Sequence, residues 1–442
     1  MLKKAGGKED ESGAVVKISE AMFPAPFRSG LEYAAPARGT WNIVHTGFLI
    51  PEAHEIFVCA GSCLRGVVLT AAEMGASERF STIAVCENNV LDGDMESLIV
   101  DGVADILKKL PYKPKAVLVY TSCVHHFIGC DLPLVYKRLR EKFTDIDFTD
   151  CYMNPIMRKS GLTPDMIMRS RLYSLLKEQP KNQKSVNIIG NDFATDKNSE
   201  LVKIIKENGF ILHEIQDCKT YIEYQKMAES VLNITYQPAA AAGGDELQKR
   251  LNQKHLYLPL SFNYDEIINN YNVLCDELEI GRINFAAEIE SCENALNKLK
   301  SEIGDTPVAI DYTATFRPLG LARLLLEHKI NVERIYADSF INEERADFDE
   351  LQKISPDLKI IATSNVKMRF LTRKTDEKIL AVGQKAAYFT GSNNFVNIVE
   401  CGGYYGFSGI VKICDLMLDS FKNEKDAKSL IGIKGMGCGC CI

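Results

Sequence analysis

Short apolar runs alternate with helical stretches along most of the chain, and this alternation constrains the fold more than any other sequence feature. The first block of the pattern covers residues 56–58, 64–74, 83–85, 95–110 and 116–120. Similar blocks open near residues 185 and 307. Strands separated by helices of this length favour right-handed crossovers and parallel sheets. The sequence therefore predicts an α/β fold of parallel β-sheets flanked by helices.

The length of 442 residues allows about three domains of roughly 150 residues each. We expect three Rossmann-like domains around a central interdomain cleft, because polar residues follow the predicted strands where open parallel sheets bind ligands. A near-helical apolar pattern over residues 265–303, interrupted at Gly281, predicts two linking helices. The predicted segments are a flexible arm without core (1–30), three domains (31–182, 183–303 with its linking helices, 304–424) and a flexible Cys-rich tail (425–442).

The charge balance argues against two classes of partner. The chain has 52 Lys+Arg and 59 Asp+Glu, a net charge of -7, so no global positive field attracts nucleic acid or an anionic membrane. It also contains no run of 18 uncharged apolar residues, and the N-terminus lacks the apolar core of a signal peptide. We therefore predict a cytoplasmic protein that binds neither nucleic acid nor membrane.

Cysteine is abundant, with 14 residues. Cytoplasmic thiols stay reduced, so metal ligation is a better reason for this number than disulfides. Cys59 and Cys63 lie where a predicted strand meets a helix, and Cys123 and Cys130 lie on a second loop of the same sheet. Two such loops can face one metal centre, and thiolates prefer iron or zinc. Cys86 is a weaker candidate, and buried cysteines that pack as small hydrophobes remain the alternative throughout.

The histidines and the tail give weaker indications. His125 and His126 could ligate a metal or carry protons, but we expect these two, His45 and His54 to be structural or solvated. The tail cysteines lie among glycines, which suits a metal-capturing tail, exposed redox thiols or a disordered end. They are Cys438, Cys440 and Cys441. Prenylation is excluded because Gly439 occupies the fourth position from the end.

Three segments carry a family resemblance. Residues 54–59 are similar to an H-G-P-x-G-C motif, with Glu55 and Ile56 in place of Gly and Pro. Residues 122–132 are similar to an S-x-C-P-x-x-x-I-G-D-D-I motif, with one residue fewer between Ser and Cys. Residues 403–409 are similar to Y-x-G-Y-D-G. Cys123 follows Cys59 by 64 positions (123 minus 59), close to the spacing between the second and third cluster cysteines of that family. Over residues 30 to 421 the chain resembles the nitrogenase component 1 superfamily, which includes nitrogenase molybdenum-iron protein subunits, their assembly scaffolds and dark protochlorophyllide reductases.

The departures from the family pattern matter as much. Residues 31–34 hold no counterpart of the first cluster cysteine, for which Cys63 is the available substitute. The turn that holds the family's cofactor corresponds to residues 235–241, which contain no cysteine, and the position of the cofactor histidine falls near Val396. The resemblance therefore implies no iron-molybdenum cofactor, no molybdenum or vanadium, and no dinitrogen reduction.

The resemblance implies an oxidoreductase subunit with its own iron-sulfur cluster, either [4Fe-4S] or a larger P-cluster-like one. Cys59, Cys63 and Cys123 would ligate it, with Cys130 the first choice for the fourth ligand ahead of Cys86 or a second subunit. The chain lacks a G-x-x-x-x-G-K-[ST] phosphate loop, so an iron-protein-like ATP-dependent reductase would deliver the electrons. A homodimer or a pair with a paralogous subunit is expected. The alternatives are a scaffold for a nascent metallocluster and a regulatory relative without turnover.

The expected cleft has a distinctive lining. Gln237, Pro238 and the alanines 239–242 leave space for a bulky organic substrate such as a tetrapyrrole, or for a weakly held metallocluster. The turns Asn191-Asp192 and Thr315-Phe316-Arg317 should line the same cleft, with Arg317 gripping a carboxylate through its planar fork. The alternative is a tightly packed helix start, because Ala favours helices and Gly permits close approach.

Overall fold

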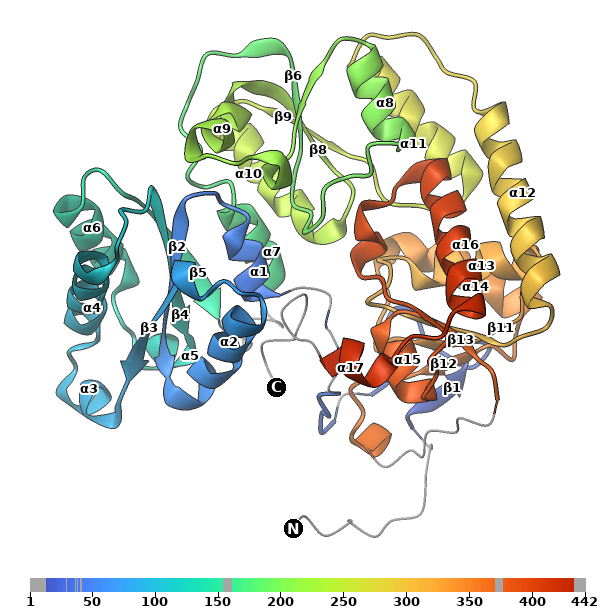
Figure 1. The fold of residues 1–442 in the computed structure, drawn as a ribbon, viewed down its shortest axis with the longest axis horizontal. Helices are drawn as coiled ribbons and strands as arrows, with labels where there is room; N and C mark the ends of the chain where they lie inside the picture. Colours follow the sequence, from blue (N-terminus) through green and yellow to red (C-terminus); the bar gives the residue numbers. More distant parts are fainter. Residues whose placement is uncertain are drawn as a thin grey trace. The chain divides into compact units, whose positions relative to one another are not determined.

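A computed structural model describes residues 13–28, 30–35, 37, 39, 42–153, 161–369 and 377–432. It contains three β-sheets in which the strands run parallel, apart from one edge strand, with helices on their faces (Figure 1). The predicted α/β fold is confirmed. The chain divides into two compact units, of which one holds the first two sheets and the other holds the third.

The first sheet is fully parallel, in the order β3-β2-β4-β5. Its strands are β2 (Ala53–Ala60), β3 (Phe80–Val85), β4 (Ala116–Ser122) and β5 (Asp147–Met153). Alternate residues of β2 enter two different cores: Phe57 and Cys59 pack on one face of the sheet, and Ile56 and Val58 on the other. The two central strands, β2 and β4, are mostly apolar because helices cover both faces of the sheet.

The helices of this first domain divide between the two faces of the sheet (Figure 1). On the Cys59 face lie α1 (Ile43–Phe48), α2 (Gly61–Glu73) and α7 (Pro164–Arg171). On the opposite face lie α4 (Met95–Lys109) and α6 (Leu132–Lys142). Two short helices, α3 (Glu87–Asp92) and α5 (Cys123–Phe127), begin where β3 and β4 end. Strands β2, β3 and β4 are each followed directly by a helix, in agreement with the predicted alternation.

The second sheet lies in the same unit and is also parallel, in the order β7-β6-β8-β9. Its strands are β6 (Asn182–Ile188), β7 (Ile211–His213), β8 (Ser230–Thr235) and β9 (Lys254–Tyr257), and α9 (Tyr221–Lys226) and α10 (Ala241–Leu251) belong to the same domain. Asn187 on β6 donates to Asn233 on β8 at 2.7 Å, so even the buried polar residues of this sheet are paired. Helix α10 starts six residues after β8, at the predicted Ala-Gly run.

The third sheet has six strands in the order β1-β12-β11-β10-β13-β14. They are β1 (Val15–Lys17), β10 (Val308–Asp311), β11 (Val332–Tyr336), β12 (Lys359–Ile361), β13 (Leu380–Val382) and β14 (Phe395–Val396). The helices of this unit are α8 (Glu200–Glu207, whose last three residues belong to the other unit), α11 (Tyr264–Glu277), α12 (Ala286–Ile303), α13 (Pro318–Glu327), α14 (Arg345–Ile354), α15 (Gln384–Thr390), α16 (Gly406–Lys422) and α17 (Ala427–Gly432). The two linking helices predicted on either side of Gly281 are α11 and α12.

The two chain ends differ from the predicted coreless arm and flexible tail. Residues Val15–Lys17 form β1, which pairs antiparallel with β12, and the flanking Ala14 and Ile18 are fully buried. In the tail, α17 buries Ala427 and Ile431 in the core beside the third sheet. Both segments are stabilised by surfaces far away in sequence: an open sheet edge supplies backbone partners to a short strand, which local polarity cannot reveal. Among the described residues, no helix is both long and apolar enough to cross a membrane.

Candidate functional site

The first candidate site lies where β2 and β4 end side by side. Strand β2 passes into α2 at Gly61, and β4 passes into α5 at Cys123. The register pairs Val58 with Thr121. The next residue, Cys59, therefore lies beside Ser122, which ends β4 and directly precedes Cys123. Neighbouring strands lie about 4.8 Å apart. The topology therefore brings Cys59, Cys63 in the first turn of α2, and Cys123 to one edge of the sheet.

Burial and the two neighbouring thiols act on Cys59. Burial, together with the nearby Cys63 and Cys123, raises the pKa of Cys59 to about 12. Cys59 is fully buried, whereas Cys63 and Cys123 are half-buried. A thiolate at Cys59 therefore requires a compensating positive charge, and a bound metal provides one. Soft sulfur donors of this kind suit iron or zinc.

The structure does not bring Cys130 and Cys86 into this group. Cys130 packs against the core on the α4 and α6 face, and burial together with the neighbouring Glu96 raises its pKa to about 12. Cys86 is exposed at the start of α3. Cys438, Cys440 and Cys441 lie outside the described residues. Within the described ranges, no three His, Cys, Asp or Glu side chains converge as a metal site.

The histidines have structural partners or lie apart from the thiols. His54 is buried and its two ring nitrogens contact the Tyr112 hydroxyl at 2.7 Å and the Ser81 hydroxyl at 2.8 Å. His125 is buried beside Cys123 with Nδ1 at 3.2 Å from the Ser122 carbonyl, and His126 is exposed. His45 on α1 contacts the Asp192 carbonyl at 3.4 Å.

His54 is expected to make the fold sensitive to acid. Burial lowers its pKa from 6.5 to about 4, so the unfolded chain binds the proton first as pH falls. The stability that neutral His54 contributes is present above pH 6.5 and is lost progressively toward pH 4, by at most about 1.4 kcal/mol per pH unit. Urea melts of the wild type and His54→Gln across this window test it. The variant should show a smaller slope, and identical slopes would contradict the prediction.

The sequence pattern did not identify Glu55, on β2, as a candidate site residue. Its carboxyl group is fully buried on the Cys59 face and accepts from the Tyr120 hydroxyl at 3.2 Å. Burial holds the pKa of Glu55 well above its usual range, which disfavours a negative charge on this carboxyl group. A glutamate within a mostly apolar predicted strand is the sequence feature that could have indicated this buried carboxyl group.

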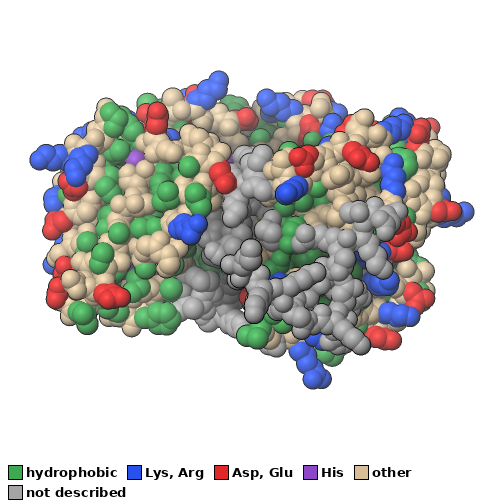
Figure 2. Space-filling model, turned by 60° about the horizontal axis from the view of Figure 1, so that its bottom comes forward, with side chains coloured by type: hydrophobic (Ala, Val, Ile, Leu, Met, Phe, Trp, Pro, Cys, Tyr) green, Lys and Arg blue, Asp and Glu red, His purple; other side chains and the backbone are tan. Residues whose placement is uncertain are grey.

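The helices that follow β2, β3 and β4 carry a set of exposed apolar side chains, the apolar band. They lie on α2, α3, α5 and the residue after α5, and are Val68, Leu69, Leu91, Phe127 and Ile128. Leu91 is 82% exposed and Phe127 is 70% exposed, which is unusual for such large side chains. Figure 2 shows apolar side chains among polar and charged ones on the described surface of this face. Large apolar side chains that stay exposed make these helices the candidate for an interaction surface.

The second candidate site lies at the carboxyl ends of β6 and β8. The Gly190 carbonyl accepts hydrogen bonds from the Gln237 side-chain amide and from Arg169, the latter at 2.6 Å. Arg169 is fully buried and also binds Asp192 at 3.0 Å. Gly190 has a positive φ of 87°, and a β-carbon there would overlap Ala240. The structure therefore brings the predicted Asn191-Asp192 turn next to Gln237.

Arg317 has a different place from the one expected. Its guanidinium is buried in the third-sheet unit, where it binds Glu266 at 2.6 Å and Asp347 at 2.7 Å. Further hydrogen bonds join it to the backbone carbonyls of Leu260 and Glu343. These partners occupy the planar fork, so the expected grip on a substrate carboxylate is not what this structure shows. A polar turn in sequence could not reveal acidic partners located 30 to 51 positions away.

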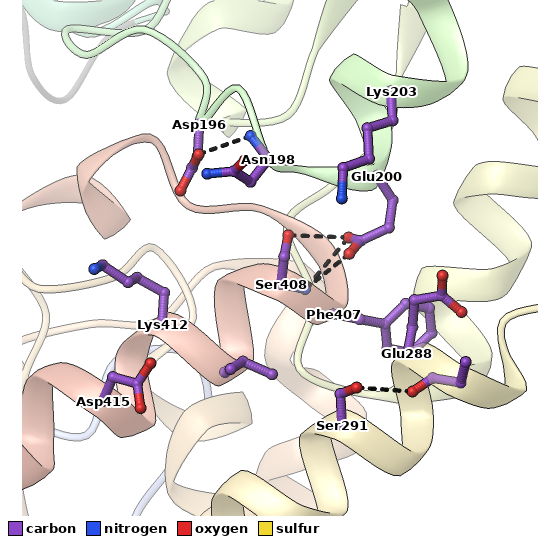
Figure 3. Close-up of a pocket in the computed structure, with 12 residues that line it drawn as sticks. Asp196, Asn198, Glu200, Lys203, Glu288, Ser291, Phe407, Ser408, Lys412 and Asp415 are labelled. Atoms are coloured by element: carbon purple, nitrogen blue, oxygen red, sulfur yellow. Dashed lines mark hydrogen bonds between the residues drawn. The ribbon is translucent and has the colours of Figure 1, made fainter. Parts of the chain in front are cut away.

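A cavity of about 430 Å³ lies in the third-sheet unit between α8, α12 and α16 (Figure 3). Glu200 accepts from the backbone amide of Ser408 at 3.1 Å and from the Tyr271 hydroxyl at 3.1 Å, and burial raises its pKa. A carboxylate beside the first turn of α16 is favourable for the helix dipole. The rest of the lining carries charges of both signs: Asp196, Lys203, Glu288, Lys412 and Asp415. Glu200 is therefore occupied in joining α8 to α16.

Comparisons with known proteins agree with this architecture. Two solved structures share the fold: "Nitrogenase Cp1 at pH 6.5" has a TM-score of 0.63 at 14% identity, covering 89% of this chain and 94% of that one. "Nitrogenase Cp1 at pH 5" has a TM-score of 0.57 at 12% identity, covering 93% and 94%. No curated protein sequence matches the chain. The profile of the family described as nitrogenase component 1 type oxidoreductase matches residues 56–421. The chain therefore belongs to the nitrogenase component 1 type oxidoreductase family.

Proposed function

We propose that this protein is an oxidoreductase subunit that accepts low-potential electrons through its own iron-sulfur cluster and passes them to a substrate other than dinitrogen. The observation that carries the proposal is that Cys59, Cys63 and Cys123 lie near the ends of the neighbouring strands β2 and β4, at one edge of the first sheet, in a chain of this family. Three soft donors at the exposed end of a sheet suit iron better than a hard cation. The chemistry of the donor set thus fits a cluster of the [4Fe-4S] type or a larger one.

A bound cluster would accept and release single electrons, and the protein residues would set its environment. Cys59 would be the buried ligand, and the half-buried Cys63 and Cys123 would join it from the first turns of α2 and α5 when a cluster binds. Glu55 lies on the same face of β2, and burial raises its pKa, which disfavours a negative charge beside the thiolates. Because the sequence has no phosphate loop, we propose an iron-protein-like ATP-dependent reductase as electron donor, acting in the cytoplasm.

A second copy of this chain, or a paralogue, is the proposed occupant of the apolar band on α2, α3 and α5. Three thiolates leave a cubane cluster one ligand short. Cys130 is directed to the opposite face of the sheet beside Glu96, which supports a fourth ligand from the partner subunit instead. Isologous pairing is the commonest way to cover such a patch. Burial of Leu91 and Phe127 would then shield the cluster from water.

The proposed substrate is not dinitrogen, and the protein is proposed to hold no molybdenum or vanadium. At the positions that correspond to the family's cofactor ligands, the chain has the alanines 239–241 in the second domain and Val396 on β14. Neither alanine nor valine ligates a metal. A heterometal retained stoichiometrically through gel filtration, together with ammonia formation, would contradict this part of the proposal.

Anaerobic reconstitution with iron and sulfide tests the cluster. Cys123→Ala is expected to lose most of the bound iron, about four atoms per cluster in a [4Fe-4S] site, and the charge-transfer absorption with it. The matched control is Cys130→Ala, which removes a thiol from the neighbouring loop on the other face and should keep the iron. Iron and sulfide analysis with electron paramagnetic resonance of the reduced protein provides the measurement.

Two outcomes would contradict the proposal. Full iron content and an unchanged spectrum in Cys123→Ala would show that these thiols are not ligands. Transfer of the intact cluster to an apo-acceptor, with no substrate able to oxidise the reduced cluster, would make the protein an assembly scaffold rather than an oxidoreductase.

A further inference from the structure

Three neighbouring buried residues in the second domain have side-chain atoms without a hydrogen-bond partner in the described part of the chain. These atoms are Nδ2 and Oδ1 of Asn191, Oδ2 of Asp192 and Oε1 of Gln237. The residues are 6%, 2% and 0% exposed, respectively, so bulk water does not hydrate them. Native proteins leave few buried polar groups unpaired, because each one destabilises the fold. Four such atoms at the ends of β6 and β8 therefore indicate a function.

The surrounding contacts fix these side chains in place. Gln237 donates its amide to the Gly190 carbonyl, which leaves only its oxygen without a partner. Arg169 binds one oxygen of Asp192 at 3.0 Å and leaves the other oxygen unpaired. The backbone carbonyl of Asn191 accepts from Gln216 at 2.5 Å, which anchors the turn. The unpaired atoms thus belong to a preformed arrangement, as expected of a binding site.

The unpaired atoms are mostly hydrogen-bond acceptors. Asn191, Asp192 and Gln237 each contribute one oxygen, and the only unpaired donor among these three residues is the Asn191 amide nitrogen. A sulfide-bridged metal cluster needs thiolate ligands and hydrogen-bond donors, and these side chains offer no thiolate and a single donor. An organic molecule with several N–H or O–H groups would satisfy all three oxygens.

We propose that Asn191, Asp192 and Gln237 form the recognition site for an organic substrate that donates N–H or O–H hydrogen bonds, and not a cradle for a metallocluster. As the substrate class of the proposed oxidoreductase, this inference rests on the proposed function. The neighbouring His45, Phe193 and Ala239 are half-exposed, so the site lies directly beneath accessible surface. The rings of His45 and Phe193, with centroids 6.1 Å apart, offer an aromatic wall beside these polar side chains.

The first experiment compares two buried asparagines of the same domain. Asn191→Leu removes two unpaired atoms and should raise the Tm by about 1–3 °C. The matched control is Asn187→Leu, because Asn187 donates to Met227 and Asn233 and accepts from Ser230, all within 2.9 Å. The control should lower the Tm, since its three partners lose their hydrogen bonds. If Asn191→Leu lowers the Tm as much as the control, the proposal is overturned.

The second experiment uses acetamide as the probe, with N,N-dimethylacetamide as a matched probe that lacks N–H groups. In the ¹⁵N-labelled full-length protein, acetamide should shift the side-chain amide signals of Asn191 and Gln237 saturably. N,N-dimethylacetamide should shift them at least threefold less at the same concentration. Equal responses to both probes, or none at all, would overturn the proposal.

Neither experiment requires a cluster, a reductase or turnover. The inference can therefore fail while iron binding by Cys59, Cys63 and Cys123 stands, and iron binding can fail while acetamide still binds here. The two proposals are thus separately testable.

Discussion

Replacing Arg317 by methionine is expected to lower the free energy of unfolding by about 3–4 kcal/mol. The guanidinium is almost fully buried between Glu266 and Asp347, at 2.6 and 2.7 Å. Methionine fills much of the volume but leaves the Asp347 carboxylate, itself 4% exposed, without its main cation. Breaking a buried ion pair on one side is strongly destabilising, because a charge remains in a poorly solvated place. Urea denaturation of the purified variant measures the loss.

The pH dependence identifies the cause. Burial already raises the pKa of Asp347, and Arg317 counteracts that rise, so the variant's carboxyl should have a still higher pKa. A raised carboxyl pKa means that stability falls as pH rises, so the loss should be larger at about pH 8 than at about pH 5. The control Arg282→Met removes an exposed partner of Asp276 and should change stability by less than about 1 kcal/mol. Equal losses in the two variants would contradict the structural role of Arg317.

A glycine-to-alanine change at position 47 is expected to destabilise the first domain by about 2–3 kcal/mol. Gly47 lies in α1, where alanine normally stabilises a helix. In this fold a β-carbon at that position would overlap the Glu55 carboxyl and the Tyr120 hydroxyl. Both groups are fully buried, and Tyr120 is stacked on Phe57 with ring centroids 4.1 Å apart, so neither can move away freely.

The matched control for this change is Gly281→Ala. A β-carbon at that glycine would meet no heavy atom within 4 Å, and its φ is not positive. Alanine there should leave stability unchanged or raise it by less than about 1 kcal/mol. Denaturant melts of both variants give the comparison. A Gly47→Ala protein as stable as Gly281→Ala would show that α1 does not pack on Glu55 as described.

The edge of the first sheet near Cys59, Cys63 and Cys123 shows which site residues the strand pattern can predict. Residues 56–58 and 116–120 are apolar runs, and their pattern predicts two strands of one parallel sheet with helices after them, whereas the structure shows that these strands, β2 and β4, are neighbours. Parallel strands end at one edge, so Cys59 and Cys123 could be expected near each other from sequence. Cys130 could not be placed this way. Its side chain follows the tight turn at Gly129, with a φ of 69°, and turns to the α4 and α6 face beside Glu96.

The sequence by itself determined the layered α/β architecture, the family and the two linking helices, because these depend on the local period of apolar residues and on short motifs. Tertiary structure alone decided three other matters. Arg317 pairs with Glu266 and Asp347, and residues 15–17 form an edge strand of the third sheet. Oxygens of Asn191, Asp192 and Gln237 lie together without a hydrogen-bond partner among the described residues. Each depends on which distant groups meet in the folded chain, and such long-range pairing has no signature in local pattern. A buried charge or amide is defined by its partners, and only the folded chain supplies or withholds them.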